Sequence, residues 1–182
     1  MAERVTICLP EVSGEAVATE TSAGRLSVPI NAIAEKTVTV DAELVSALRD
    51  AARDVASRAA APYSGFHVGA ALVMADDPER RIFTGANAEN ASYGGTICAE
   101  RTAITQAASH GFRKIELLVV SCIDALDAPL VDRSPCGICR QVISEFASED
   151  PTTLVVVDRS EPDALGDVLD IDRLLPHRFS LR

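Results

Sequence analysis

Three of the five cysteines fall in a pattern that can hold a metal ion. Cys136 and Cys139 form a C-x-x-C motif, and Cys98 lies well upstream of that pair. A C-x-x-C motif alone is ambiguous between a redox pair and half of a metal site, but the redox interpretation leaves Cys98 without a role. Three thiolates suit Zn²⁺ and leave its fourth position for water, as in catalytic zinc sites. The pattern therefore predicts one zinc ion held by three thiols.

The alternative is a closed structural zinc site, in which a fourth protein ligand takes the place of the water. The candidates for that ligand are Cys8, Cys122, His67, His110 and His177. The histidines are scattered without ligand spacing, and Cys122 ends an apolar run typical of a buried strand. We therefore favour the open site.

Glu100 follows Cys98 by two residues, which brings a carboxylate close to the predicted metal. Such a group can take a proton from zinc-bound water and carry it elsewhere. A glutamate in the first turn of a helix is also favoured by the helix dipole alone, and the two roles are compatible. Zinc with three thiolates has a net negative formal charge. We expect Arg101 to offset that charge by hydrogen-bonding the thiolates, with a surface salt bridge as the alternative.

Strands alternating with helices would position these residues. Asp41 is a suitable N-cap for a helix that ends before Pro62, because a proline steers the preceding residue out of the α region. Apolar runs predict further elements, namely strands at Val68–Met74, 81–87, 115–122 and 153–157, helices at 98–110 and 136–147, and a short strand and helical turn after Pro162. This alternation is typical of an α/β fold.

The topology of such a fold would bring the three thiols together. If the strands at 81–87, 115–122 and 153–157 are parallel, right-handed crossovers place both intervening helices on one face of the sheet. The N-termini of both helices then lie at the carboxyl edge of the strands, where open α/β sheets bind ligands. Cys98 opens one of these helices, and Cys136 and Cys139 open the other.

Residues 1–40 differ in pattern from the rest of the chain. Short apolar pieces stand among Gly, Ser, Thr and Ala, and neither a helical nor a strand period persists. We interpret residues 1–40 as an N-terminal extension to a catalytic domain at 41–182. The extension is either a loosely ordered tail or an arm that packs on the domain or on a neighbouring subunit.

Composition excludes several classes of function. The 182 residues include 17 basic and 27 acidic side chains, and the net charge of −10 has the wrong sign for a protein held to nucleic acid. No apolar run approaches the roughly 18 residues that span a bilayer, and no signal-peptide pattern is present. An odd number of cysteines without an export signal is a poor disulfide framework. We expect a cytoplasmic protein without nucleic-acid or membrane partners.

The candidate residues stand within longer motifs that resemble the small zinc-dependent cytidine deaminases of pyrimidine salvage. The matching stretches are PYSGFHVGAAL at 62–72, GANAENASYG at 85–94, TICAERTAI at 96–104 and SPCGICRQV at 134–142. The ending Leu174-Leu175-Pro176 with Phe179 fits as well, so the resemblance spans about residues 41–180. The extension at 1–40 has no counterpart in the compact members of that family.

The resemblance implies a three-layer α/β/α sandwich with a mixed five-stranded sheet, assembled as a homotetramer with one zinc ion per subunit. It implies hydrolysis of cytidine and deoxycytidine to uridine and deoxyuridine with release of ammonia. In that chemistry a water on zinc attacks C4 of the base, and a glutamate that is not a ligand moves protons. Here the glutamate would be Glu100, and the ligands would be Cys98, Cys136 and Cys139.

The resemblance also implies contacts to the substrate. Phe66 would stack on the pyrimidine, and the backbone N–H of Ala99 would bind the base carbonyl. Asn87 and Glu89 would bind the ribose hydroxyls. Taken alone, a phenylalanine at a strand entry is equally a core residue, and Asn and Glu after a strand are equally turn residues. Residues from a neighbouring subunit would complete the site, namely Ala91, Tyr93 and Phe179.

Two other functions stay open. A deaminase of a modified cytosine nucleoside would share all of these residues and differ in how its pocket fits the substrate. A non-catalytic, zinc-stabilised interaction module would not need a carboxylate such as Glu100 beside an open zinc position. Cys98 stands where deaminases of bases, nucleotides and nucleic acids usually have histidine, which favours a free nucleoside as the substrate.

Overall fold

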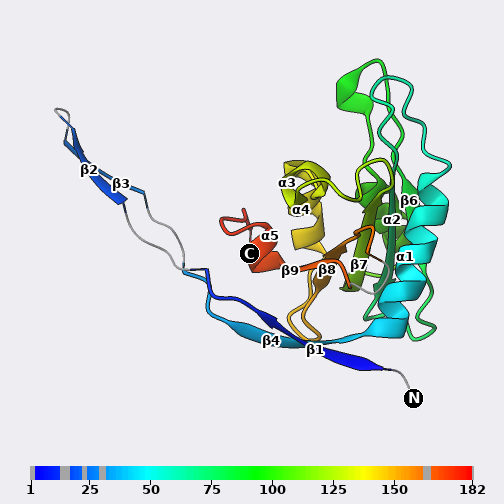
Figure 1. The fold of residues 1–182 in the computed structure, drawn as a ribbon, viewed down its shortest axis with the longest axis horizontal. Coiled ribbons are helices and arrows are strands. Elements are labelled where there is room, and N and C mark those ends of the chain that lie inside the picture. Colours follow the sequence, from blue (N-terminus) through cyan, green and yellow to red (C-terminus); the bar gives the residue numbers. More distant parts are fainter. Residues whose placement is uncertain (1–2, 13–16, 22–23, 29–31, 162–164, 182) are drawn as a thin grey trace.

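A mixed five-stranded sheet forms the centre of the computed structural model, which describes residues 3–12, 17–21, 24–28, 32–161 and 165–181 (Figure 1). The strand order is β6-β5-β7-β8-β9. Their bounds are β5 (Val68–Met74), β6 (Phe83–Ala86), β7 (Ile115–Cys122), β8 (Leu154–Val157) and β9 (Asp167–Asp170). β5 is antiparallel to both β6 and β7, β7 is parallel to β8, and β9 is antiparallel to β8. Strands β6, β7 and β8 therefore run in one direction, as the sequence predicts.

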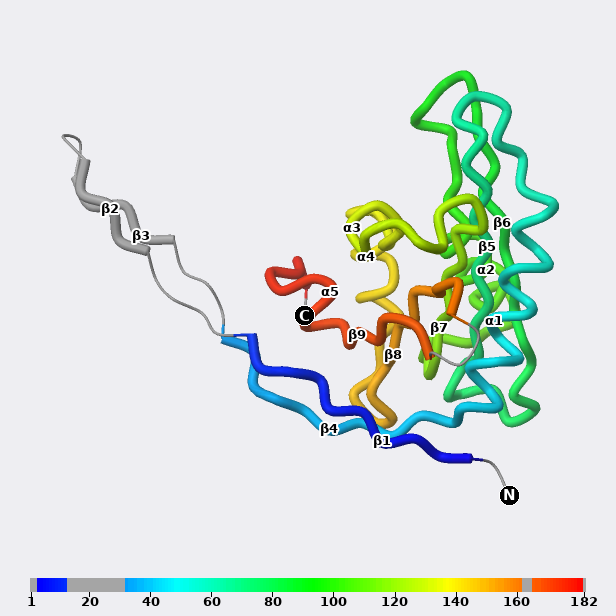
Figure 2. The backbone as a smooth tube through the Cα atoms, viewed as in Figure 1, coloured from blue at the N-terminus to red at the C-terminus, as the bar shows by residue number. Residues whose placement is uncertain are grey.

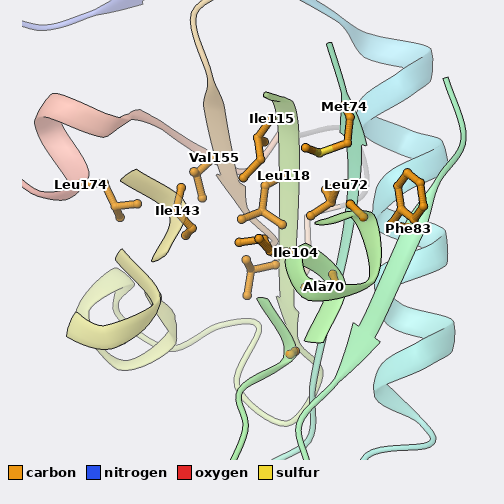
Figure 3. Close-up of a cluster of buried hydrophobic side chains, with 14 residues drawn as sticks. Ala70, Leu72, Met74, Phe83, Ile104, Ile115, Leu118, Ile143, Val155 and Leu174 are labelled. Carbon is orange, nitrogen blue, oxygen red and sulfur yellow. The ribbon is translucent and has the colours of Figure 1, made fainter. Parts of the chain in front are cut away.

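Helices cover both faces of this sheet, so the predicted α/β/α sandwich is confirmed. Alternation along β5 turns Leu72 towards a cluster that includes Ile104 and Ile143, from α2 (Ala99–Ser109) and α4 (Gly137–Glu145) (Figure 3). Its neighbour Val73 faces a second cluster that includes Leu48 of α1 (Ala42–Ala56). The short helix α5 (Ile171–Leu174) lies on the same face as α2 and α4. Among the described residues, no helix is long and apolar enough to cross a membrane.

The helix boundaries follow local signals. Asp41 caps α1 by accepting the Leu44 N–H at 3.1 Å, and Gly111 follows the end of α2 with φ +97°. The helix α1 ends at Ala56, several residues before Pro62, because Ala60 hydrogen-bonds the segment that follows β6. The four-residue helix α3 (Leu130–Arg133) and a 3₁₀ turn at Tyr93–Gly95 were not predicted.

Two glycines set how closely the helices approach the sheet. A Cβ at Gly69 of β5 would lie 1.9 Å from the Ala52 carbonyl oxygen of α1. A Cβ at Gly85 of β6 would lie 2.5 Å from both the Ala99 carbonyl oxygen and the Ala103 nitrogen of α2. With contacts this short, a side chain at either position would force the helix away from the sheet. The backbone of Gly85 thus fixes the first turn of α2, which follows Cys98.

The N-terminal extension contains regular structure. β1 (Arg4–Leu9) pairs antiparallel with β4 (Lys36–Asp41), and we call this pair the stem; the two strands run side by side along the domain towards α1 (Figure 2). A second antiparallel pair consists of β2 (Val17–Thr21) and β3 (Gly24–Val28). Residues 1–2, 13–16, 22–23 and 29–31 of the extension lie outside the described residues.

The stem contacts the domain through apolar side chains and hydrogen bonds. Leu9, Val38 and Val40 are buried in the cluster on the α1 face. The Arg173 side chain of α5 donates hydrogen bonds to the carbonyl oxygens of Leu9, Pro10 and Ala34. The described part of the stem thus contacts both α5 and the α1 face, and the division into an extension at 1–40 and a domain at 41–182 stays our proposal.

Candidate active site

Three thiols meet where two helices begin. Cys98 and Cys136 are the N-cap residues of α2 and α4, and Cys139 lies in the first turn of α4. The three sulfur atoms lie within 4.8 Å of one another, and the Cys98 and Cys136 sulfurs are 3.8 Å apart. Tetrahedral zinc with bonds of about 2.3 Å to sulfur places its ligands about 3.8 Å apart. The donor set and its spacing therefore fit one zinc ion.

The neighbourhood favours an open site over a closed one. Among the described residues, no histidine, carboxylate or further cysteine joins the three thiols in one metal-sized cluster. All five cysteines are free thiols. Cys122 is buried, and its burial raises the pKa of the thiol to about 12, as expected of a wall residue rather than a ligand.

Hydrogen bonds within the cluster shift the pKa values of two of the thiols. The Cys139 thiol hydrogen-bonds Cys98 and, with Arg101, lowers the pKa of Cys98 to about 5, while the same interaction raises the pKa of Cys139. The Arg101 Nη2 donates to the Thr96 carbonyl oxygen at 2.8 Å and lies 3.7 Å from the Cys98 sulfur. Arg101 thus contacts the thiol cluster and, among the described residues, forms no ion pair with a carboxylate.

Glu100 is the buried carboxylate of the site. The residue is 3% exposed, in the first turn of α2, and lines the same cavity as Cys98 and Cys136. Burial raises the pKa of Glu100 to about 7. A carboxyl group that titrates near neutral pH can both accept and return a proton during a reaction. Its place beside the thiols is the one expected from the sequence.

One cavity of about 230 Å³ connects these residues with three of the predicted substrate contacts. Phe66, Asn87 and Glu89 line it together with Cys98, Glu100 and Cys136. Ala99 is buried beside Cys98, and its side chain does not line the cavity. Sequence reasoning missed other lining residues, which are Ser64, Val68, Thr96, Val120, Cys122, Asp132, Arg133 and Ser134. The carboxyl end of β7 could have indicated Val120 and Cys122, whereas no motif signal marks Asp132.

Asn87 and Glu89 are already hydrogen-bonded to the segment that carries Phe66. The Asn87 amide donates to the Phe66 carbonyl oxygen at 2.9 Å and accepts the Val68 N–H at 2.8 Å. The Glu89 carboxylate accepts the N–H groups of Tyr63 and Ser64 and the Ser64 hydroxyl. These bonds hold the wall formed by Phe66, which is the turn role that the residues alone suggested.

The residues expected from a neighbouring subunit do not line this cavity. Tyr93 is 80% exposed and Phe179 is 65% exposed, and Ala91 is exposed as well. The Phe179 segment is fixed to α4, because Gln141 donates to the Phe179 carbonyl oxygen at 3.0 Å. Both aromatic rings are therefore available on the surface of a single chain.

A three-layer α/β/α domain with three thiols at two helix N-termini beside a buried glutamate has the donor set and proton carrier of a zinc-dependent hydrolase. Residues 42–155 match the family model described as the cytidine and deoxycytidylate deaminase zinc-binding region. The chain belongs to the cytidine deaminase family.

Relatives and solved structures agree with this assignment. The chain is 41% identical over 133 residues to a probable cytidine deaminase from Dictyostelium discoideum, over 72% of this chain and 80% of that protein. It is 42% identical over 121 residues to a cytidine deaminase from Halalkalibacterium halodurans, over 65% of this chain and 81% of that protein. The crystal structure of a cytidine deaminase from Burkholderia pseudomallei matches with 40% identity and a TM-score of 0.61, over 73% of this chain and 97% of that one.

Proposed function

We propose that this protein hydrolyses cytidine and deoxycytidine to uridine and deoxyuridine, with release of ammonia, as a zinc-dependent enzyme of pyrimidine salvage. The observation that carries this proposal is one cavity that joins two thiols of a zinc-compatible triad, Cys98 and Cys136, to the buried carboxylate Glu100. Membership of the cytidine deaminase family supports the choice of substrate.

The thiols of Cys98, Cys136 and Cys139 would hold the zinc ion. When bound, zinc supplies Lewis-acid chemistry that makes water a nucleophile at neutral pH. Arg101 would keep the Cys98 thiolate stable by its contact from outside the cluster. The N-termini of α2 and α4 add favourable N–H dipoles at the same place.

Glu100 would carry the protons of the reaction. Its carboxylate would accept a proton from the attacking water and pass it to N3 of the pyrimidine. It would then take the second proton from the hydroxyl added at C4 and deliver it to the departing amino nitrogen. The balance is one water consumed and one ammonia released for each nucleoside. Burial of Glu100 excludes bulk water from this exchange.

The cavity walls would orient the nucleoside. Phe66 would stack on the base, and the Ala99 N–H would donate to the base carbonyl. A carboxylate has about four acceptor sites and an amide keeps a spare donor and lone pair. Glu89 and Asn87 thus retain capacity for ribose hydroxyls beyond their bonds to the 63–68 segment.

Assembly into a homotetramer is part of the proposal. The exposed rings of Tyr93 and Phe179, with Ala91, would then reach the cavity of a neighbouring subunit. Replacing Phe179 by alanine should raise the KM for cytidine while the zinc content stays unchanged. An unchanged KM, or a fully active monomer in sedimentation at assay concentration, would contradict this arrangement. A cytoplasmic location is proposed as well, because a reducing compartment keeps the three thiols free to bind metal.

The direct test of the proposed activity uses the purified, zinc-loaded protein. Cytidine, deoxycytidine, cytosine and CMP are incubated separately, and ammonia and the base product are measured. We expect turnover of the two nucleosides. Ammonia from cytosine alone, or from none of the four, would contradict the proposal.

A further inference from the structure

The cavity has a buried floor and an exposed rim. Glu100 and Cys122 form part of the floor, with exposed fractions of 3% and 4%. Asp132 of α3 and Ser64 line the same cavity but are exposed, so they belong to its rim. A pyrimidine that reaches Glu100 must fill the floor. The sugar and any group attached to it then lie at the rim.

The rim carries negative charge and offers no available cation. Among the described residues that line the cavity, Arg133 is the one basic side chain, and its side chain is 1% exposed. Its guanidinium donates to the carbonyl oxygens of Ala128 and Asp158 and to the Asp167 carboxylate. Because its Nε, Nη1 and Nη2 groups each donate to a protein acceptor and its surface is covered, Arg133 does not meet a phosphate on a substrate.

Arg133 instead fixes the place of its neighbour Asp132. The bond to Asp158 ties α3 to the end of β8, and the bond to Ala128 holds the loop that precedes α3. The Asp132 N–H donates to the Pro129 carbonyl oxygen within the same short helix. Among the described residues, no basic side chain forms an ion pair with Asp132. These hydrogen bonds fix the backbone of Asp132, so its exposed carboxylate stays at the rim of the cavity that Glu89 also lines.

We propose that Asp132 is a specificity-determining residue, which disfavours cytosine nucleosides that carry negative charge on the sugar and favours those that carry positive charge there. The inference rests on the proposed function and deepens it. A carboxylate several ångströms from a phosphate dianion weakens binding by about threefold at moderate salt, and reversal of its charge doubles the effect on the free energy. The residues proposed to arrive from a neighbouring subunit, Ala91, Tyr93 and Phe179, are uncharged. Arg178, which precedes Phe179, is paired with Asp172 of its own chain.

The test compares the binding of CMP by the zinc-loaded wild type, Asp132→Asn and Asp132→Lys. CMP is measured as a competitive inhibitor of cytidine deamination at low and high salt. The inhibition constant of CMP should fall about threefold in Asp132→Asn and about tenfold in Asp132→Lys at low salt. Both differences should shrink at high salt, because counterions screen exposed charges. A cationic probe, 5′-amino-5′-deoxycytidine, should respond with the opposite sign.

Glu43→Lys is the matched control, because it changes the net charge by the same amount as Asp132→Lys. Glu43 is exposed in the first turn of α1, roughly 20 Å along that helix from its other end, which leads towards Ser64. Equal inhibition constants for CMP in wild type and both Asp132 variants would overturn the inference. So would an effect of Glu43→Lys as large as that of Asp132→Lys.

Failure of the proposed function would be visible separately. Calorimetric titration with cytidine and with CMP reads the same charge effect without turnover. Absence of ammonia from cytidine would contradict the deaminase activity and leave the comparison of Asp132 variants intact. Deamination of cytidine with no charge effect on CMP would contradict the role of Asp132 alone.

Discussion

Gly85 of β6 lies directly against Ala99 of α2, so that a Cβ at Gly85 would sit 2.5 Å from the Ala99 carbonyl oxygen. The contact sets how far from the sheet the first turn of α2 lies. This turn follows Cys98 and contains Glu100. Gly69 makes the equivalent contact with α1, on the opposite face of the sheet. Gly69 can therefore serve as a control for Gly85, because Gly85 contacts α2, which begins at Cys98, whereas Gly69 contacts α1.

The substitution Gly85→Ala is expected to push the start of α2 away from the sheet. Overpacking of this kind lowers the free energy of unfolding by about 1–3 kcal/mol, and the displaced Cys98 should release zinc faster. Gly69→Ala should lower stability at least as much, because its Cβ would lie closer to the helix backbone, but it should release zinc at the wild-type rate. Chemical unfolding and transfer of zinc to a chromogenic chelator measure the two effects. Equal rates of zinc release from the two variants would show that Gly85 does not position α2.

Replacing Cys136 by alanine should remove the metal. Two remaining thiols do not complete a zinc shell, and the ion that would join α2 to α4 is lost with its contribution to stability. Cys122→Ala is the control, because this thiol lines the same cavity outside the triad. Atomic absorption should find zinc in Cys122→Ala and little in Cys136→Ala. Full occupancy in Cys136→Ala would contradict the ligand assignment.

Arg173 is expected to be the main attachment of the stem. Its side chain is 5% exposed and pairs with Asp170 at 2.8 Å, while it also donates to the Leu9, Pro10 and Ala34 carbonyl oxygens. Arg173→Met leaves the buried Asp170 carboxylate unpaired and should lower the free energy of unfolding by about 3 kcal/mol. Arg178→Met removes an exposed ion pair with Asp172 and should change the free energy of unfolding by less than about 0.5 kcal/mol. Urea unfolding measures both, and equal effects would show that the stem does not depend on Arg173.

Local signals were sufficient to predict the elements that hold the metal. The N-terminus of α2 at Cys98 and that of α4 at Cys136 follow from short-range patterns and strand direction. The stem was not predicted, because the alternation of Val5, Ile7 and Leu9 with exposed residues spans only six residues and its burial comes from contacts with the α1 face. β-structure of this kind is decided by what the strand packs against.

The cavity was predicted only in part for a similar reason. Asp132 lies on a four-residue helix that no periodicity can reveal, and its place depends on the bonds of Arg133 to the distant residues Asp158 and Asp167. Resemblance suggested Asn87 and Glu89 as substrate contacts. Their hydrogen bonds to the segment of Phe66 depend on a loop that folds back across the sheet edge, which no motif encodes.

Ammonia release from cytidine by Glu100→Gln, compared with wild type at equal zinc content, tests the central claim most directly. The amide has the same shape as the carboxylate but cannot accept the proton of the attacking water. Loss of a general acid and base lowers a rate by about 10²–10⁴, and we expect the upper end because Glu100 would serve several transfers. Zinc content and thermal stability should match the wild type. Turnover by Glu100→Gln within tenfold of wild type would contradict the assignment of Glu100 as the proton carrier of a cytidine deaminase.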